Sequence, residues 1–192
     1  ALIALEKESG MIMPDSPSVR VGAAPLANFE PHRHISRLWS MDKVQSKEAL
    51  ALWFARCEKL HRDLSDGRSE PLAPLHYAVE YKLDGLTINL TYQDGQLIQA
   101  ATRGNGEVGE GILPQAKTIR CVPLSIPYKG LLEVQGECIM RLSTLEAYNK
   151  TAAEPLKNAR NGAAGALRNL DPTVTATRKL DAFFYQVGTI EQ

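Results

Sequence analysis

A β-hairpin centred on Asp94-Gly95 is the feature of this sequence that most restricts its fold. Apolar residues alternate with polar ones from Leu86 to Tyr92, which predicts a strand with one buried face. Asp-Gly is a favoured two-residue hairpin turn, and residues 96–102 supply the partner strand. Because hairpins dominate over strand–helix–strand units, we expect an α+β fold with antiparallel sheets flanked by helices, and not a doubly wound one.

Other periodic stretches predict the remaining elements. Apolar residues at helical spacing predict a helix over residues 46–64, with Ser46 as its N-cap. Ser143 and Glu146 have the spacing of a capping box for a short helix. We further expect the end of a helix over residues 1–9, strands over 76–81, 131–139 and 182–187, a glycine-rich loop over 104–111, and a helix over 160–170 that is stopped by Asp171-Pro172.

Composition limits the class of protein. The chain has 192 residues, 44% of them hydrophobic and 23% charged, with a formal net charge of zero. These values are ordinary for a globular domain, and zero net charge predicts no strong nonspecific attraction to nucleic acid. The three cysteines, Cys57, Cys121 and Cys138, form no C-x-x-C pair, which argues against a zinc site or a disulfide framework. No stretch approaches the roughly 20 apolar residues that span a membrane.

The run Val79 to Gly85 places a lysine between two carboxylates. If this run is a strand, Glu80, Lys82 and Asp84 share one face. A lysine at the rim of a sheet suits a nucleophile that forms a covalent intermediate, whereas the plainer interpretation is a structural salt bridge. With an ordinary pKa near 10.4, only about one lysine in a thousand is neutral near pH 7.4. The neighbouring anions favour the charged form, so a metal ion, arginines or desolvation must assist.

Residues 104–109 match the pattern G-x-G-x-x-G, which permits a dinucleotide-binding interpretation. Such a site requires a helix directly after the loop and a βαβ frame, and Pro114 together with the preceding hairpin argues against both. A mobile glycine loop beside a nucleotide site fits the sequence better. Arg103 ends the strand before this loop, and its alternative role is that of a surface residue.

Two later segments carry further candidates. Glu133, Gln135 and Glu137 share one face of the strand over 131–139, and glycine in that strand indicates close approach of a ligand or another backbone. The helix over 160–170 has a face of small residues that can pack closely on a sheet. Arg160 and Arg168 lie about 80° apart on that helix and can reach one anionic ligand together, or they can simply be exposed.

Taken together, these segments closely resemble the adenylation (nucleotidyltransferase) domain of bacterial NAD-dependent DNA ligases, from about Ser18 to Gly188. The pattern K-x-D-G also occurs in other ligases and in capping enzymes. The runs specific to the NAD-dependent branch are Leu38-Trp39-Ser40-Met41-Asp42, Ala101-Thr102-Arg103-Gly104-Asn105-Gly106 and residues 158–172.

The resemblance implies a role for each candidate. Lys82 attacks the α-phosphorus of NAD, releases nicotinamide mononucleotide and holds AMP, and Asp84 positions the lysine or its metal. AMP then passes to the 5′-phosphate of nicked DNA, and the 3′-hydroxyl displaces it. Ser40 and Met41 line the nucleotide pocket, Glu80 and Leu83 contact the adenine, Arg103 and Glu137 contact the ribose side, Tyr185 stacks on the adenine, and Arg160 and Arg168 serve the phosphate and DNA steps.

The resemblance also implies the setting of the protein. NAD is the AMP donor and Mg²⁺ the neutralising ion, whereas zinc belongs to a different domain and no metal ligand is expected in this chain. The partner is nicked double-stranded DNA in replication and repair, and the enzyme is a monomer of the bacterial cytoplasm, associated with the nucleoid and not with a membrane. The alternative is a nucleotide-binding fragment or paralogue without catalytic activity.

The expected domain organisation follows from the same comparison. Residues 1–17 form the tail of a preceding helical module and its linker, and residues 18–192 form an incomplete adenylation domain of the nucleotidyltransferase (ATP-grasp-like) fold. We expect the chain to belong to a longer ligase with oligonucleotide-binding, zinc-finger, helix-hairpin-helix and BRCT modules. Four departures from the usual family pattern are Gln135 in place of arginine, Asn105 in place of aspartate, Ala159 in place of proline, and the stretch over 112–115.

Overall fold

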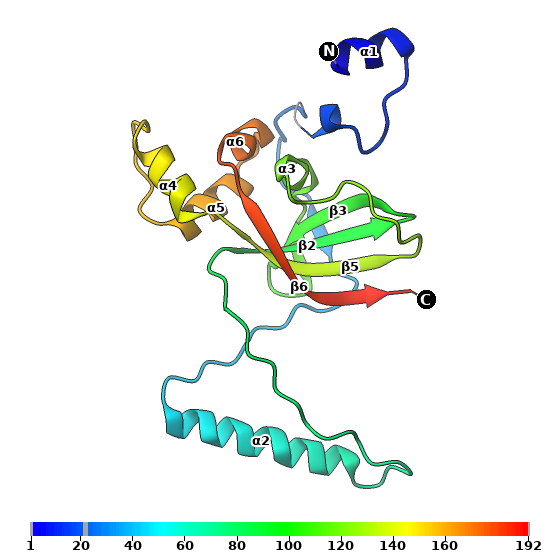
Figure 1. The fold of residues 1–192 in the computed structure, drawn as a ribbon, viewed down its shortest axis with the longest axis vertical. Coiled ribbons are helices and arrows are strands. Elements are labelled where there is room, and N and C mark those ends of the chain that lie inside the picture. The colour runs from blue at the N-terminus through cyan, green and yellow to red at the C-terminus, as the bar shows by residue number, and fades with distance from the viewer. Residues whose placement is uncertain (1, 21–22, 192) are drawn as a thin grey trace. The chain divides into compact units, whose positions relative to one another are not determined.

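The computed structural model describes residues 2–20 and 23–191, which fold into two compact units (Figure 1). The larger unit consists of residues 1–39 and 83–192, and the smaller unit of residues 40–82. The helices are α1 (Leu2–Ser9), the 3-10 turn η1 (Pro17–Val19), α2 (Lys47–Ser65), α3 (Leu113–Thr118), α4 (Leu142–Asn149), α5 (Ala159–Leu167) and α6 (Pro172–Thr177). The strands are β1 (Pro31–Arg33), β2 (Leu86–Gln93), β3 (Gln96–Thr102), β4 (Val108–Glu110), β5 (Leu132–Ile139) and β6 (Asp181–Ile190).

An antiparallel four-stranded sheet in the order β3-β2-β5-β6 forms the centre of the larger unit. Strands β2 and β3 are joined at Asp94-Gly95, where both residues have positive φ, as the sequence predicted. A second, two-stranded sheet pairs β1 with β4. The α+β class with antiparallel sheets and helices is therefore confirmed.

The apolar face of the central sheet carries the hydrophobic core. Ile88 and Leu90 of β2 are fully buried, together with Ile112 beside α3 and Leu167 of α5. Helices α3, α5 and α6 lie on the same side of the sheet (Figure 1). Each buried aliphatic side chain of this kind stabilises the fold by about 1.5–3 kcal/mol.

Helix α5 approaches the sheet closely because its inner face carries small side chains. Ala163 and Ala166 are buried, and a Cβ on Gly162 would lie 3.0 Å from the Met140 sulfur. The prediction of a small-residue helix face against the sheet is confirmed. The helix ends at Leu167, earlier than predicted, and Asp171 then caps a new helix, α6, whose first residue is Pro172. Proline suits that first position because no helical partner is lost there.

The smaller unit consists of α2 and the segment that follows it. The predicted N-cap is confirmed, because the Ser46 side chain accepts a hydrogen bond from the Ala49 amide. Phe54 of α2 packs edge to face with Tyr77 at a ring separation of 4.7 Å, and the Trp53 ring lies tilted against Tyr77 at 5.9 Å. Tyr77, in the segment after α2, therefore packs against the helix.

Two predicted elements are wrong. Residues 76–81 form no strand, and pairing with β5 begins only at Leu86. Val79 and Tyr81 are each 97% exposed, so this segment has no buried face that would fix a strand register. The capping box is also wrong, because α4 begins at Leu142 after Arg141, which places Ser143 inside the first turn.

Candidate active site

The second face of the central sheet is polar. In the β2–β5 register, Thr87 lies opposite Glu137, Asn89 opposite Gln135 and Thr91 opposite Glu133. This confirms that the three β5 residues share one face. Glu133 is fully buried, and Gln135 and Glu137 retain no more than 9% exposure. Buried carboxylates require hydrogen-bond donors, so each must be accounted for.

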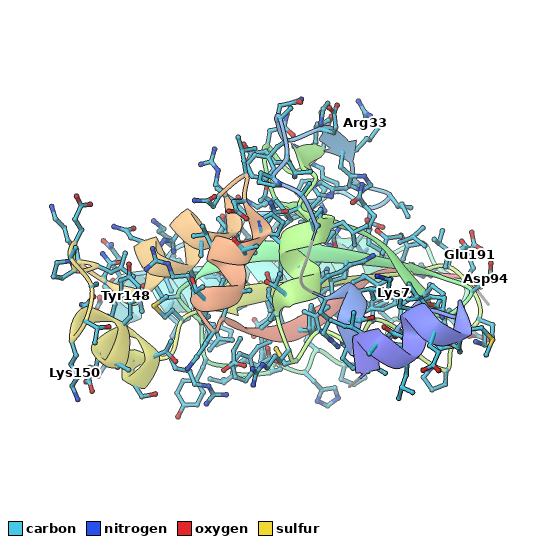
Figure 2. The ribbon with its side chains drawn as sticks, turned by 90° about the horizontal axis from the view of Figure 1, so that it is seen from above. Lys7, Arg33, Asp94, Tyr148, Lys150 and Glu191 are labelled. Carbon is cyan, nitrogen blue, oxygen red and sulfur yellow. The ribbon has the colours of Figure 1, made fainter. Side chains whose placement is uncertain are left out.

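Glu137 lies at the end of this face that receives the chain from Gly85. The Gly85 amide donates to Glu137 Oε1 and the Thr87 hydroxyl donates to Oε2, both at 3.2 Å. This is the opposite end of β2 from the hairpin turn, where Asp94 and Glu191 lie at the same end of the sheet (Figure 2). Glu137 is thus fixed where β2 begins.

Tyr185 and Arg103 belong to the same end of the face. Burial raises the pKa of the Tyr185 phenol and the Glu137 carboxylate adds to that rise, whereas Thr87 and Arg103 oppose it. Three side chains therefore influence Tyr185 of β6: Glu137 of β5, Thr87 of β2 and Arg103 after β3, and Thr87 also donates to Glu137. An aromatic ring beside a carboxylate and a guanidinium provides stacking and polar contacts for a nucleoside.

Asp84 and Arg160 form an ion pair beside this group. Arg160 Nη1 donates to Asp84 Oδ1 at 2.7 Å, and both side chains are more than half exposed. The Asp84 hydrogen bond raises the pKa of the Arg160 guanidinium, and the charge on Glu137 contributes to the same rise. Arg160 therefore lies within the electrostatic reach of both carboxylates.

Arg168 has a different partner from Arg160. It follows α5 as the C-cap, and its guanidinium donates to both oxygens of Glu110 at 2.9 and 3.1 Å. The bidentate geometry fixes the plane of the guanidinium. Because α5 ends before Arg168, the helical spacing that suggested a shared anion does not hold, and the two arginines pair with separate carboxylates.

A hydrogen-bond network covers the other end of the polar face. Glu133 accepts from the backbone amides of Ile35 and Ser36 at 3.2 and 3.0 Å, and from Asn89 Nδ2 at 2.8 Å. Asn89 Nδ2 also lies 3.1 Å from His34 Nδ1, and His34 Nε2 lies 3.1 Å from the Arg103 carbonyl oxygen. The segment after β1 is thereby held on the sheet.

His32, His34 and Glu133 bring three ligand-type atoms within 4.8 Å of one another. The arrangement does not fit a metal ion, because both ring nitrogens of His34 and both oxygens of Glu133 already contact protein groups. Burial lowers the pKa of His32, to which nearby His34 contributes. His32 lies in β1, and His34 is buried directly after that strand.

The smaller unit contains four of the predicted site residues: Ser40, Met41, Glu80 and Lys82. Each is exposed, and none belongs to a helix or strand. The predicted common strand face of Glu80, Lys82 and Asp84 is therefore not present. Leu83 is half-buried and opens the second segment of the larger unit.

The glycine loop is not a dinucleotide-binding turn. It leads into β4, which pairs antiparallel with β1, and the next helix begins only at Leu113. Asn105 Oδ1 accepts from the amides of Glu107 and Val108 at 2.9 and 2.8 Å. Either an aspartate or an asparagine oxygen can hold this turn, so this departure from the family pattern preserves the local geometry.

Comparisons with known proteins identify the family. Residues 26–192 match the NAD-dependent DNA ligase adenylation domain, and the chain belongs to this family. It is 58% identical over 190 residues to the DNA ligase of Alkaliphilus oremlandii and 53% identical over 190 residues to that of Alkaliphilus metalliredigens, covering 99% of this chain and 28% of each relative. It is 49% identical over 190 residues to the DNA ligase of Finegoldia magna, covering 99% of this chain and 29% of that relative. The chain thus spans less than a third of the length of these relatives.

The described helices include none with the length and apolar character needed to cross a bilayer.

Sequence reasoning missed Asn89, His34 and the structural use of Glu133. The available signal was the alternation of polar residues along β2, which marked a polar face but not what covers it.

Proposed function

We propose that this chain carries the adenylation chemistry of an NAD-dependent DNA ligase, with the Lys82 amine as the nucleophile. The neutral amine attacks the α-phosphorus of NAD, a nitrogen–phosphorus bond forms, and the phosphorus–oxygen bond to nicotinamide mononucleotide breaks. The leaving group takes the bonding electrons, and Lys82 loses its proton. AMP then passes to the 5′-phosphate of nicked DNA, and the 3′-hydroxyl displaces it.

The observation that carries the proposal is the group formed by Glu137, Tyr185 and Arg103 at the start of β2. Lys82 precedes Gly85 by three residues, so the chain itself limits their separation to roughly 11 Å. Gly85 in turn donates to Glu137. The chain therefore joins the segment that carries Lys82 directly to the residue whose amide binds Glu137.

The roles of the other residues are part of the proposal. Tyr185 stacks on the adenine, Glu80 and Leu83 contact its edge, and Arg103 and Glu137 bind the ribose side. Ser40 and Met41 line the nucleotide pocket. Arg160 and Arg168 serve the phosphate and DNA steps, and both have carboxylate partners that an incoming phosphate must replace or share.

Mg²⁺ is proposed as the neutralising ion. Mg²⁺ keeps several waters and binds substrate phosphates, and the exposed carboxylate of Asp84 positions the lysine or this ion. When bound, the ion offsets phosphate charge. Asp84 meanwhile orients Arg160 through their hydrogen bond, which leaves the guanidinium available for phosphate oxygens.

The remaining expectations concern the whole protein. We propose the nucleotidyltransferase (ATP-grasp-like) fold, a boundary between residues 17 and 18, and nicked double-stranded DNA as the partner of a monomeric, cytoplasmic and nucleoid-associated ligase acting in replication and repair. Zinc is assigned to a domain outside this chain.

The test uses the full-length ligase that contains this chain. Incubation with NAD is expected to place one AMP on Lys82, as measured by peptide mass spectrometry, and Lys82→Arg is expected to abolish both the adduct and nick sealing. Lys150→Arg, a substitution of an exposed lysine after α4 (Figure 2), is the matched control and retains both. Sealing by Lys82→Arg at the parent rate would refute the assignment. A parent protein that binds NAD without forming the adduct would instead favour the inactive paralogue.

A further inference from the structure

The segment after β1 is tied to Arg103 by a continuous series of hydrogen bonds. The series runs from the Ile35 and Ser36 amides to Glu133, from Glu133 to Asn89, from Asn89 to His34, and from His34 to the Arg103 carbonyl. Glu133, Asn89 and His34 are all buried, with 0%, 1% and 6% exposure. These three side chains therefore fix one another's positions, so that substitution of one is expected to displace the other two.

The donors and acceptors in this series are determined by chemistry. The Asn89 amide nitrogen has two hydrogens, one for Glu133 Oε1 and one for His34 Nδ1. His34 Nδ1 must then be an acceptor, so the ring is neutral and its proton is on Nε2. That proton is donated to the Arg103 carbonyl oxygen.

Position 133 requires a carboxylate because both of its side-chain oxygens accept hydrogen bonds from backbone amides. Two successive backbone amides each donate to a different oxygen of the same carboxylate. A glutamine of the same shape offers an oxygen at one position and an N–H group at the other, so one backbone amide would face a donor. The charge is satisfied here by three N–H groups, and no ion pair joins Glu133 to a cation in the described part of the chain.

The position of Arg103 gives this network its functional meaning. Arg103 follows β3, and its charge opposes the rise that burial causes in the pKa of the Tyr185 phenol. The Arg103 carbonyl oxygen accepts from two groups: the Gly106 amide within the same loop at 3.0 Å, and the His34 ring from the distant segment after β1 at 3.1 Å. Because the Arg103 carbonyl is held in this way, the backbone position from which the Arg103 side chain extends is also fixed.

We propose that Glu133, Asn89 and His34 form a positioning unit for Arg103, so that its guanidinium is placed for NAD before NAD binds. This inference rests on the proposed role of Arg103 at the ribose side of the nucleotide. None of the three residues touches the nucleotide in this proposal, so they are positioning residues and not catalytic ones.

The test is a double-mutant cycle in the full-length ligase. The rate of Lys82 adenylation is measured in single turnover over a range of NAD concentrations for the parent, Asn89→Leu, Arg103→Ala and the double variant. Asn89→Leu is expected to raise the half-saturating NAD concentration about tenfold, as for the loss of one well-placed polar contact, with a smaller effect on the maximal rate. In the Arg103→Ala background, the same change is expected to add less than about twofold.

A matched control separates positioning from general destabilisation. Gln115 is fully buried and its amide donates to the Asn169 carbonyl at 2.9 Å, on the apolar side of the sheet. Gln115→Leu also removes a buried amide, but it is expected to leave the half-saturating NAD concentration unchanged. Glu133→Gln keeps the side-chain shape and is the second variant. It is expected to raise the same concentration and to speed hydrogen exchange of the Ile35 and Ser36 amides.

The outcomes distinguish failure of the proposed role of Arg103 from failure of the positioning unit. If Arg103→Ala binds NAD as the parent does, the proposed role of Arg103 fails. If Arg103→Ala weakens NAD binding but Asn89→Leu and Glu133→Gln do not, or if their effects add fully in the double variant, the positioning unit is refuted and the site stands. Should Asn89→Leu fail to fold, Glu133→Gln with Arg103→Ala completes the cycle.

Discussion

Gly85 is the position at which one added methyl group should do most damage to the site. A Cβ built on Gly85 would lie 2.0 Å from the Cys138 carbonyl oxygen and 2.9 Å from the Ile139 Cγ2 atom, whereas real Cβ contacts are essentially never shorter than 3.0 Å. The nearest atom, the Cys138 carbonyl oxygen, belongs to the backbone, so no side-chain rotamer change can relieve the clash. Strands β2 and β5 must separate by about 1 Å at the pair Leu86–Cys138, or Gly85 must move away.

The magnitude follows from the cost of overpacking. Inserting a methyl group into a closed space costs about 1–3 kcal/mol, and opening rates for local exchange scale tenfold per 1.4 kcal/mol. Gly85→Ala should therefore speed hydrogen exchange of the β2 and β5 amides by roughly 5- to 150-fold in the full-length protein. The shift also removes the Gly85 amide from Glu137, so adenylation of Lys82 should slow as well.

A second glycine supplies the control. Gly165 lies in α5, and an added Cβ would meet nothing within 4 Å. Gly165→Ala should stabilise α5 by about 0.5–1 kcal/mol and slow its exchange by roughly two- to fivefold. Unchanged exchange in β2 and β5 and normal adenylation of Gly85→Ala would refute the reasoning.

Two further predictions concern a helix cap and a buried histidine. Asn158 caps α5 by accepting from the Asn161 amide at 2.7 Å, so Asn158→Ala should cost about 0.5–2 kcal/mol and speed exchange in α5, whereas Ser143→Ala should leave α4 unchanged because Ser143 is not a cap. Burial lowers the pKa of His32, so the unfolded chain binds a proton more readily and stability falls as the pH drops below about 6.5. Thermal unfolding of His32→Gln should lose less stability between about pH 7.5 and 5.5 than the parent or His76→Gln, and an equal loss would contradict this account.

The departures from the family pattern have different structural weight. Ala159 is the first residue of α5, where proline is favoured but alanine costs the helix nothing. Asn105 keeps the turn that aspartate would make. Gln135 is buried on the polar face with an amide in place of a guanidinium, so it is the departure that changes the charge of the site.

The predictions from sequence were wrong where a local pattern had no packing partner in the folded protein. The run before Gly85 has alternating residues, yet its exposed side chains gain nothing from a strand conformation, and Tyr77 packs on α2 instead. Ser143 and Glu146 have the spacing of a capping box, but the helix begins two residues earlier than that pattern requires. A local motif of this kind permits a strand or a helix cap. Burial of the side chains determines whether that element forms.

Features that depend on residues close together in the chain could be predicted from the order of the amino acids. The positive-φ turn at Asp94-Gly95, the alternation along β2 and the cap at Ser46 each involve groups within a few positions of one another. Family membership followed from the order and spacing of such motifs.

The covering of the polar face, by contrast, depends on contacts between residues far apart in the chain. His34 and Asn89 are 55 positions apart, and Ser36 and Glu133 are 97 positions apart. Their hydrogen bonds exist because the β2–β5 register and the β1–β4 pair bring buried polar groups together, and each such group must find a donor or acceptor once water is excluded. No local pattern specifies which distant residue fulfils that requirement.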